Sequence, residues 1–205
     1  HTTEVAFEVT YHWFLNRHEK MLAEATPFLS RELRSDHFEG HACAKALLTL
    51  LRQKHPEAAM PYHRRGYKLR STNPRHVDTI AEHIGFLALT DNLPRALRLF
   101  EKHFPIAWKS PSDFVRLWFI LDALPLFDRL RKNKQTTLKL RLPTDCPVYQ
   151  RDGKYVVKEL RQWFHDTAEQ WALSFDARNG NNYFATRLRK VPLLQKLFMP
   201  CPWNT

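Results

Sequence analysis

Glycine, cysteine and long apolar runs are all scarce in this sequence. Five glycines among 205 residues leave few places for tight turns, which favours helices over a sheet-rich fold. The three cysteines, Cys43, Cys146 and Cys201, are far apart and odd in number. They argue against a disulfide framework or a cysteine zinc site and favour a reducing, cytoplasmic location. The longest apolar run, residues 117–121, is too short to span a membrane, and no signal peptide is recognisable.

Recognisable catalytic motifs are also missing. The sequence contains no glycine-rich phosphate loop, no GxSxG nucleophile motif and no paired-carboxylate motif. We therefore expect a protein that is not an enzyme and that needs no cofactor and no metal.

Helical patterns cut by thirteen prolines fill most of the chain. Apolar spacing and capping residues predict helices over residues 4–24, 35–54, 57–69, 76–104, 110–124, 126–131, 155–175, 183–189 and 193–198. Residues 76–104 form a helical hairpin, because Thr90-Asp91-Asn92 breaks the pattern and Pro94 suits a helix start. We expect Pro27, Pro105 and Pro125 to end, bend or split helices, and residues 200–205 to form a tail.

One segment follows a strand pattern instead. Residues 138–142 alternate strictly between leucine and a basic residue, which is typical of a half-buried strand. Asp152-Gly153 then signals a turn. The sequence therefore predicts a small β-like insertion near residues 138–157.

These elements indicate an all-α fold. One hairpin cannot bury its own apolar faces, so neighbouring hairpins must stack on it. We expect helical hairpins stacked as a short α-solenoid. Residues 1–136 form the helical-repeat region, and residues 137–205 form an extended segment with C-terminal capping helices, in one continuous domain.

The segment 81–105 resembles a tetratricopeptide repeat. The resemblance is carried by the small residues Gly85, Ala88 and Ala96, by the aromatic Phe100 and by the closing Pro105. It covers one repeat clearly and neighbouring segments loosely. The resemblance implies a concave surface that binds a peptide or partner protein, without catalysis by the repeat itself.

The formal net charge of +11 directs attention to basic clusters. One cluster lies between residues 63 and 75, beside the hairpin. Its candidate binding residues are Arg64, Arg65, Tyr67, Lys68, Arg70 and Arg75. Such a cluster could bind phosphate, including that of nucleic acid, an acidic protein or an anionic membrane surface, and the alternative interpretation is a solvated surface. A second basic zone spans residues 132–158.

Three further groups have a chemical and a structural interpretation. His37 and His41 are one helical turn apart and could share a metal, or serve as surface histidines. Arg98 and His103 match a loose spacing found in helical ribonucleases, or lie on a solvated helix face. The polar loop 176–181 is a binding loop or, as we expect, a helix stop followed by a turn.

The sequence therefore predicts a protein-interaction scaffold that grips an acidic partner segment on a basic helical surface. A nucleic-acid-binding helical domain is the alternative, and a helical ribonuclease is a third hypothesis.

Overall fold

A computed structural model describes residues 2–203, and helices dominate this part of the chain. The α-helices are α1 (Thr2–Phe14), α2 (His18–Leu29), α3 (Asp36–Arg52), α4 (Pro56–Arg70), α5 (Val77–Leu89), α6 (Leu93–Trp108), α7 (Asp113–Lys132), α8 (Val157–Asn179) and α9 (Tyr183–Lys190). Two 3-10 helices, η1 (Pro74–His76) and η2 (Val191–Leu197), join them. Within residues 2–203, no helix has both the length and the apolar character needed to cross a membrane.

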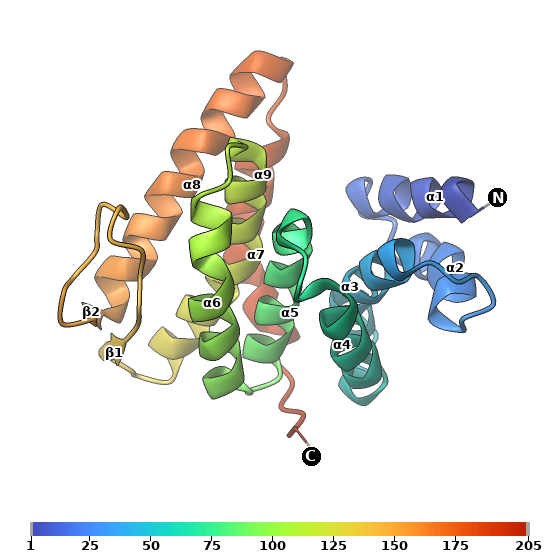
Figure 1. Cartoon of the computed structure of the whole chain (residues 1–205), viewed down its shortest axis with the longest axis horizontal. Coiled ribbons are helices and arrows are strands. Elements are labelled where there is room, and N and C mark those ends of the chain that lie inside the picture. Colours follow the sequence, from blue (N-terminus) through green and yellow to red (C-terminus); the bar gives the residue numbers. More distant parts are fainter. Residues whose placement is uncertain (1, 204–205) are drawn as a thin grey trace.

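The helices pack as a stack of neighbouring pairs (Figure 1). α1 packs against α2, α3 against α4, α5 against α6, and α7 against α8. In addition, α3, α5 and α7 contact one another in succession and form a row. We call the side of this row that faces α1 and α9 the inner face. The predicted all-α stack with a small β insertion is confirmed.

The centre of the core is α5. Every residue of α5 except Asp78 is buried, and the helix contacts α3, α6 and α7. Gly85 marks the closest approach of α5 to α7, because an added Cβ would lie 2.6 Å from the backbone oxygen of Asp122. A cluster of phenylalanines beside it joins α6, α7 and α8: Phe100, Phe104, Phe119, Phe127 and Phe164.

The predicted single helix over residues 4–24 is wrong, because the chain breaks between α1 and α2. Asn16 adopts a left-handed conformation with φ 55°. The amides of Asn16 and Arg17 bond back to the carbonyls of Trp13 and His12. This is a common C-terminal stop of a helix, in which asparagine can replace glycine.

Proline ends fewer helices than the sequence predicts. Pro27, Pro105 and Pro125 lie inside α2, α6 and α7, so the predicted stops and the split at these residues are wrong. An interior proline costs about 3 kcal/mol locally. In α7 every residue from 117 to 130 is buried, and this packing keeps the helix continuous.

The small β insertion is shorter than predicted. β1 (Thr137–Lys139) pairs antiparallel with β2 (Lys154–Val156), with Leu138 opposite Tyr155. Gly153 has φ 65°, as a turn residue before β2 requires. Beyond β1, the Leu140 amide still donates to the Gly153 carbonyl at 2.9 Å, and Leu140 and Leu142 stay buried.

Polar contacts fix the loop between α8 and α9. Gly180 ends α8 in a left-handed conformation with φ 64°, as the Asn-Gly pair predicts. The Asp176 carboxylate accepts hydrogen bonds from the amides of Phe184 and Ala185 at the start of α9. The loop 176–181 therefore has the predicted structural role.

After η2, the chain returns to the turn between α5 and α6. The Cys201 amide donates to the Thr90 carbonyl. The Asn92 side chain donates to the Cys201 carbonyl at 3.0 Å and accepts from the Trp203 amide at 3.2 Å. These bonds hold Trp203 beside α4 and α6. Residues 204–205 of the predicted tail lie outside the described residues.

Gly85→Ala tests the close approach of α5 and α7. The added methyl group meets the rigid backbone of Asp122, so we expect the free energy of unfolding to fall by about 1–3 kcal/mol, despite the better helix propensity of alanine. Urea unfolding followed by circular dichroism measures this change. Gly180→Ala is the control, because nothing lies within 4 Å of its added Cβ and only left-handed strain remains, about 1 kcal/mol. A Gly85→Ala protein as stable as the parent contradicts the close packing.

Candidate functional site

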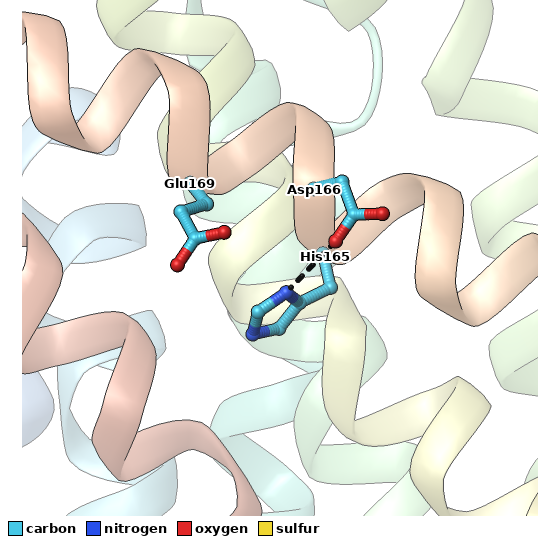
Figure 2. Close-up of side chains that lie close together, drawn as sticks. All are labelled: His165, Asp166 and Glu169. Carbon is cyan, nitrogen blue, oxygen red and sulfur yellow. Dashed lines mark hydrogen bonds and ion pairs between the residues drawn. The ribbon is translucent and has the colours of Figure 1, made fainter.

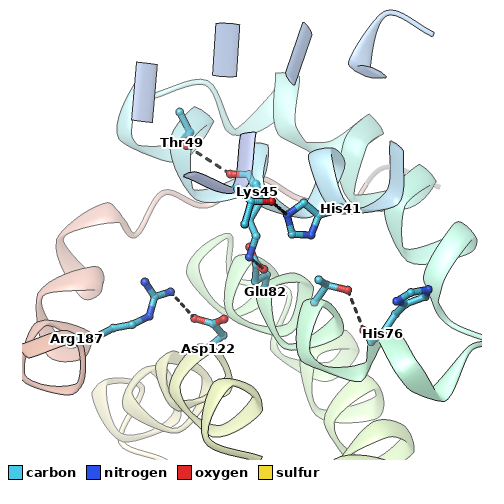
Figure 3. Close-up of polar contacts among 9 residues, drawn as sticks. His41, Lys45, Thr49, His76, Glu82, Asp122 and Arg187 are labelled. Carbon is cyan, nitrogen blue, oxygen red and sulfur yellow. Dashed lines mark hydrogen bonds and ion pairs between the residues drawn. The ribbon is translucent and has the colours of Figure 1, made fainter. Parts of the chain in front are cut away.

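A buried ion pair lies at the middle of the inner face (Figure 3). Lys45 of α3 donates to the Glu82 carboxylate of α5 at 2.5 Å, and the two side chains are 7% and 4% exposed. The Lys45 ammonium also lies 3.4 Å from the ring centre of Trp13 on α1. One charged contact therefore joins three helices.

A second ion pair lies beside the first. Arg187 of α9 donates to the Asp122 carboxylate of α7 at 3.2 Å, and Figure 3 shows the two side chains pointing toward each other. The Arg187 guanidinium lies 4.5 Å from the ring centre of Trp13 and 4.3 Å from that of Trp118. Two cations thus contact Trp13, and α9 joins the same cluster as α1, α3, α5 and α7.

Burial controls the ionisation of this cluster. Removal from water raises the pKa of the Glu82 carboxyl from its ordinary value of 4.5 to about 7, the Asp122 carboxylate adds to the rise, and the Lys45 ammonium opposes it. Burial likewise holds the pKa of His41 well below its ordinary value. Perturbed groups of this kind gather at functional sites and in structural ion-pair networks alike.

An open pocket of about 260 Å³ lies over this cluster. Acidic, basic and aromatic side chains from α1, α3, α5 and α7 line it: Thr10, Trp13, Phe14, His41, Lys45, Asp78, Glu82, Phe114, Trp118 and Asp122. Phe14 and Phe114 are 36% and 38% exposed and bring apolar surface to the solvent side. Aromatic walls with a few convergent polar groups are typical of pockets that bind small ligands or single side chains.

Of the candidate binding residues that the sequence singles out, three share one side of α4. Arg64 and Lys68 are exposed and Tyr67 is half-buried between them. Arg75 is also exposed but lies beyond the end of α4, in η1. The structure therefore brings Arg64, Tyr67 and Lys68 together and leaves Arg75 apart.

The other two predicted residues point into the protein. Arg70 is 2% exposed, and its guanidinium donates to the His37 carbonyl. Arg65 pairs with Glu39 at 2.9 Å and donates to the Leu29 carbonyl at 2.8 Å. Both side chains join helices to one another, and burial removes Arg70 from the predicted contact surface.

A groove between α4 and α6 continues the exposed basic surface. The groove encloses about 250 Å³ and is lined by His63, Arg64, Tyr67, Leu87, Arg95, Arg98, Leu99 and Trp203. The guanidinium groups of Arg64 and Arg95 lie 4.6 Å and 4.0 Å from the ring centre of Trp203. The sequence predicts a binding surface bordered by the basic residues of 63–75 and of the hairpin 76–104, but it singles out Arg98 only for catalysis and does not single out Arg95. Arg95, Arg98 and Lys102 follow helical spacing along one side of α6.

Buried histidines lie beneath this groove. His63 and His83 place their Nδ1 atoms 3.0 Å apart, and His103 shares a 3.0 Å hydrogen bond with the Tyr67 hydroxyl. Burial lowers the pKa of His63 to about 3 and that of His103 to about 4. His103 is 2% exposed whereas Arg98 is exposed, so the structure does not present the two side chains together to an RNA substrate.

The pair His37 and His41 does not form a shared metal site in this structure. The Nε2 atom of His41 lies 3.2 Å from the Thr10 hydroxyl, whereas the His37 ring packs on the His76 ring with centroids 5.0 Å apart. Each imidazole has its own partner from a different element.

A separate group of possible metal ligands lies on α8 (Figure 2). Asp166 and Glu169 are exposed and His165 is half-buried. The His165 Nδ1 atom lies 3.4 Å from the Asp166 carboxylate. All three come from one helix, and exposed acidic groups of this kind are common on solvated helix faces without a bound ion.

Comparison with protein-family models, with curated proteins and with solved structures finds no match to this chain. The resemblance of residues 81–105 to a tetratricopeptide repeat therefore stays a prediction.

Glu82→Gln tests the electrostatics of the inner face. Because the folded protein holds the Glu82 proton more tightly than the unfolded chain, this residue lowers stability as the pH rises from about 4.5 to about 7. We expect the parent to lose on the order of 1–3 kcal/mol in that window from this group and the variant to lose less. Thermal unfolding across the pH range measures the difference.

Glu159→Gln is the control for this experiment, since it makes the same change at an exposed position of α8. Its pH profile should follow that of the parent. Identical profiles for Glu82→Gln and the parent would contradict the raised pKa of Glu82.

Proposed function

We propose that this protein is an interaction module that binds an acidic segment of a partner protein in the groove between α4 and α6. The observation that carries the proposal is the lining of that groove. Three arginines, Arg64, Arg95 and Arg98, converge there from two helices, and the lining residues within 2–203 include no carboxylate. A partner segment that brings acidic side chains is complementary in charge to this lining.

The arginines of α6 are available for such a contact. Among residues 2–203, neither Arg95 nor Arg98 forms an ion pair, and neither does Lys68 or Lys102 at the edge of the groove. Guanidinium groups bind carboxylates through two parallel hydrogen bonds, which gives a contact geometric specificity as well as energy.

The floor of the groove adds an apolar requirement. Leu99, Tyr67 and Trp203 contribute apolar or aromatic surface between the arginines. Aromatic residues and arginine are the residue types that dominate binding energy at protein interfaces. The partner segment therefore combines acidic residues with an apolar or aromatic side chain, in the manner of alternating glutamate and leucine.

Reversing the charge of α6 tests this function. We expect a fluorescein-labelled peptide of alternating glutamate and leucine to bind the parent, and Arg95→Glu/Arg98→Glu to weaken that binding at least tenfold, about 1.4 kcal/mol. Both arginines lie on the surface side of α6, so the fold should persist. Fluorescence anisotropy measures the affinity, and circular dichroism checks the fold.

Lys154→Glu/Lys158→Glu is the matched control, because it reverses two exposed lysines near β2 without touching the groove. Equal weakening in both double variants would show that net charge, not the groove, attracts the peptide. Binding to RNA or duplex DNA with a steep salt dependence, in place of the peptide, would replace the acidic segment with nucleic acid as the partner.

A further inference from the structure

A second basic pocket lies on the inner face, away from the groove between α4 and α6. It encloses about 80 Å³ between the end of α1, the start of α2, the end of α3, and α9 with η2. The side chains Lys45, Arg52, Arg187 and Lys190 line it together with His18, and Asp122 is the one carboxylate among its described lining residues. A wider opening of about 730 Å³ shares Asn16, His18, Thr49 and Arg52 with it and leads to solvent.

Positive charge in this pocket exceeds negative charge. Lys45 forms an ion pair with Glu82, and Arg187 forms one with Asp122. Arg52 and Lys190 remain, and in the part of the chain that the structure describes neither forms an ion pair. Arg52 of α3 and Lys190 of α9 therefore border the pocket without an ion-pair partner among the described residues, and Glu19 of α2 is a carboxylate that lines the wider opening.

The excess of positive charge also contributes to the pKa shifts of groups that line the pocket. Burial lowers the pKa of Arg52, and the Arg187 guanidinium lowers it further. Burial also lowers the pKa of His18, with added repulsion from Arg52 and Arg187. The imidazole of His18 is consequently neutral near pH 7 and can donate or accept a hydrogen bond without adding charge.

We propose that this pocket binds a phosphate monoester, with Arg52, Arg187 and Lys190 as its charged contacts. The group carries about −1.5 to −2 charges at pH 7, which compensates the charges of Arg52 and Lys190. Asp122 accepts a hydrogen bond from Arg187 (Figure 3). The rings of Trp13 and Trp118 pack against the same guanidinium, so one contact is already positioned.

The start of α2 forms part of the same opening. Residues 16–20 line the wider part of the pocket, and α2 begins at His18 with no side-chain hydrogen bond to cap it. The free amide groups in the first turn of a helix can donate hydrogen bonds to an anion. At the start of α2, these amides would add to the contacts of the cationic side chains, which are the main contacts of the pocket. A bound anion would connect α2 and α3 to α9.

Binding can be tested on the purified chain by isothermal titration calorimetry and thermal unfolding. Inorganic phosphate and a small phosphorylated compound such as phosphoserine are titrated separately at constant ionic strength, with chloride as the reference anion. We expect saturable binding and a rise in melting temperature. The tighter of the two probes distinguishes free phosphate from an organic monoester.

Arg52→Gln/Lys190→Gln should weaken binding at least tenfold. Both residues are exposed at the pocket edge, so the fold should persist, and the single variants remain available if it does not. Lys154→Gln/Lys158→Gln, which neutralises two lysines elsewhere, and Arg95→Glu/Arg98→Glu, which alters the groove, should both bind phosphate as the parent does.

The site proposal is overturned by an absence of saturable binding to both probes, or by equal weakening in Lys154→Gln/Lys158→Gln. Because Arg95→Glu/Arg98→Glu acts on the acidic peptide and Arg52→Gln/Lys190→Gln on phosphate, failure of either site is distinguishable from failure of the other.

Discussion

The buried pair Lys45–Glu82 joins α3 to α5 at the point where α1 covers the central row. Taking two charges out of water costs several kcal/mol per ion, and attraction between them does not always exceed this cost. Here the Trp13 ring covers the Lys45 ammonium, and Asp122 with Arg187 completes the charge balance. Without Trp13, the ammonium would lose an aromatic neighbour. The ionic centre therefore requires α1 in one orientation, and this requirement shapes the pocket above it.

Most of the fold could be predicted from the sequence, because helix periodicity and capping are local properties. The start of α3 at Ser35, whose side chain accepts from the Phe38 amide, and the stop of α8 at Gly180 follow from single residues. The errors have a different origin. Asn16 ends α1 in a left-handed conformation, which local spacing does not reveal, and Pro125 stays inside α7 because tertiary burial outweighs a local preference.

The sites were less predictable, because their residues come from distant parts of the chain. Arg64, Tyr67 and Lys68 were found because they are close together on one helix. Arg70 resembles them in sequence, but the small Gly40 leaves room for its side chain under α3. The inner face had one signal that could have been used. Single charges interrupt apolar stretches of three helices at Lys45, Glu82 and Asp122, and a lone charge on a buried face needs a partner.

The return of the chain to the turn between α5 and α6 also orders the events of folding. Asn92 bonds to residues 109 and 111 positions later in the chain, so these contacts close a long loop and form late. During synthesis, α4 and α6 can be in place well before Trp203 reaches them. The groove is thus open on one side in the nascent protein and gains its aromatic wall only when the C-terminal segment docks. The nascent and the mature protein would then differ in the segments that the groove can bind, although their helices are the same.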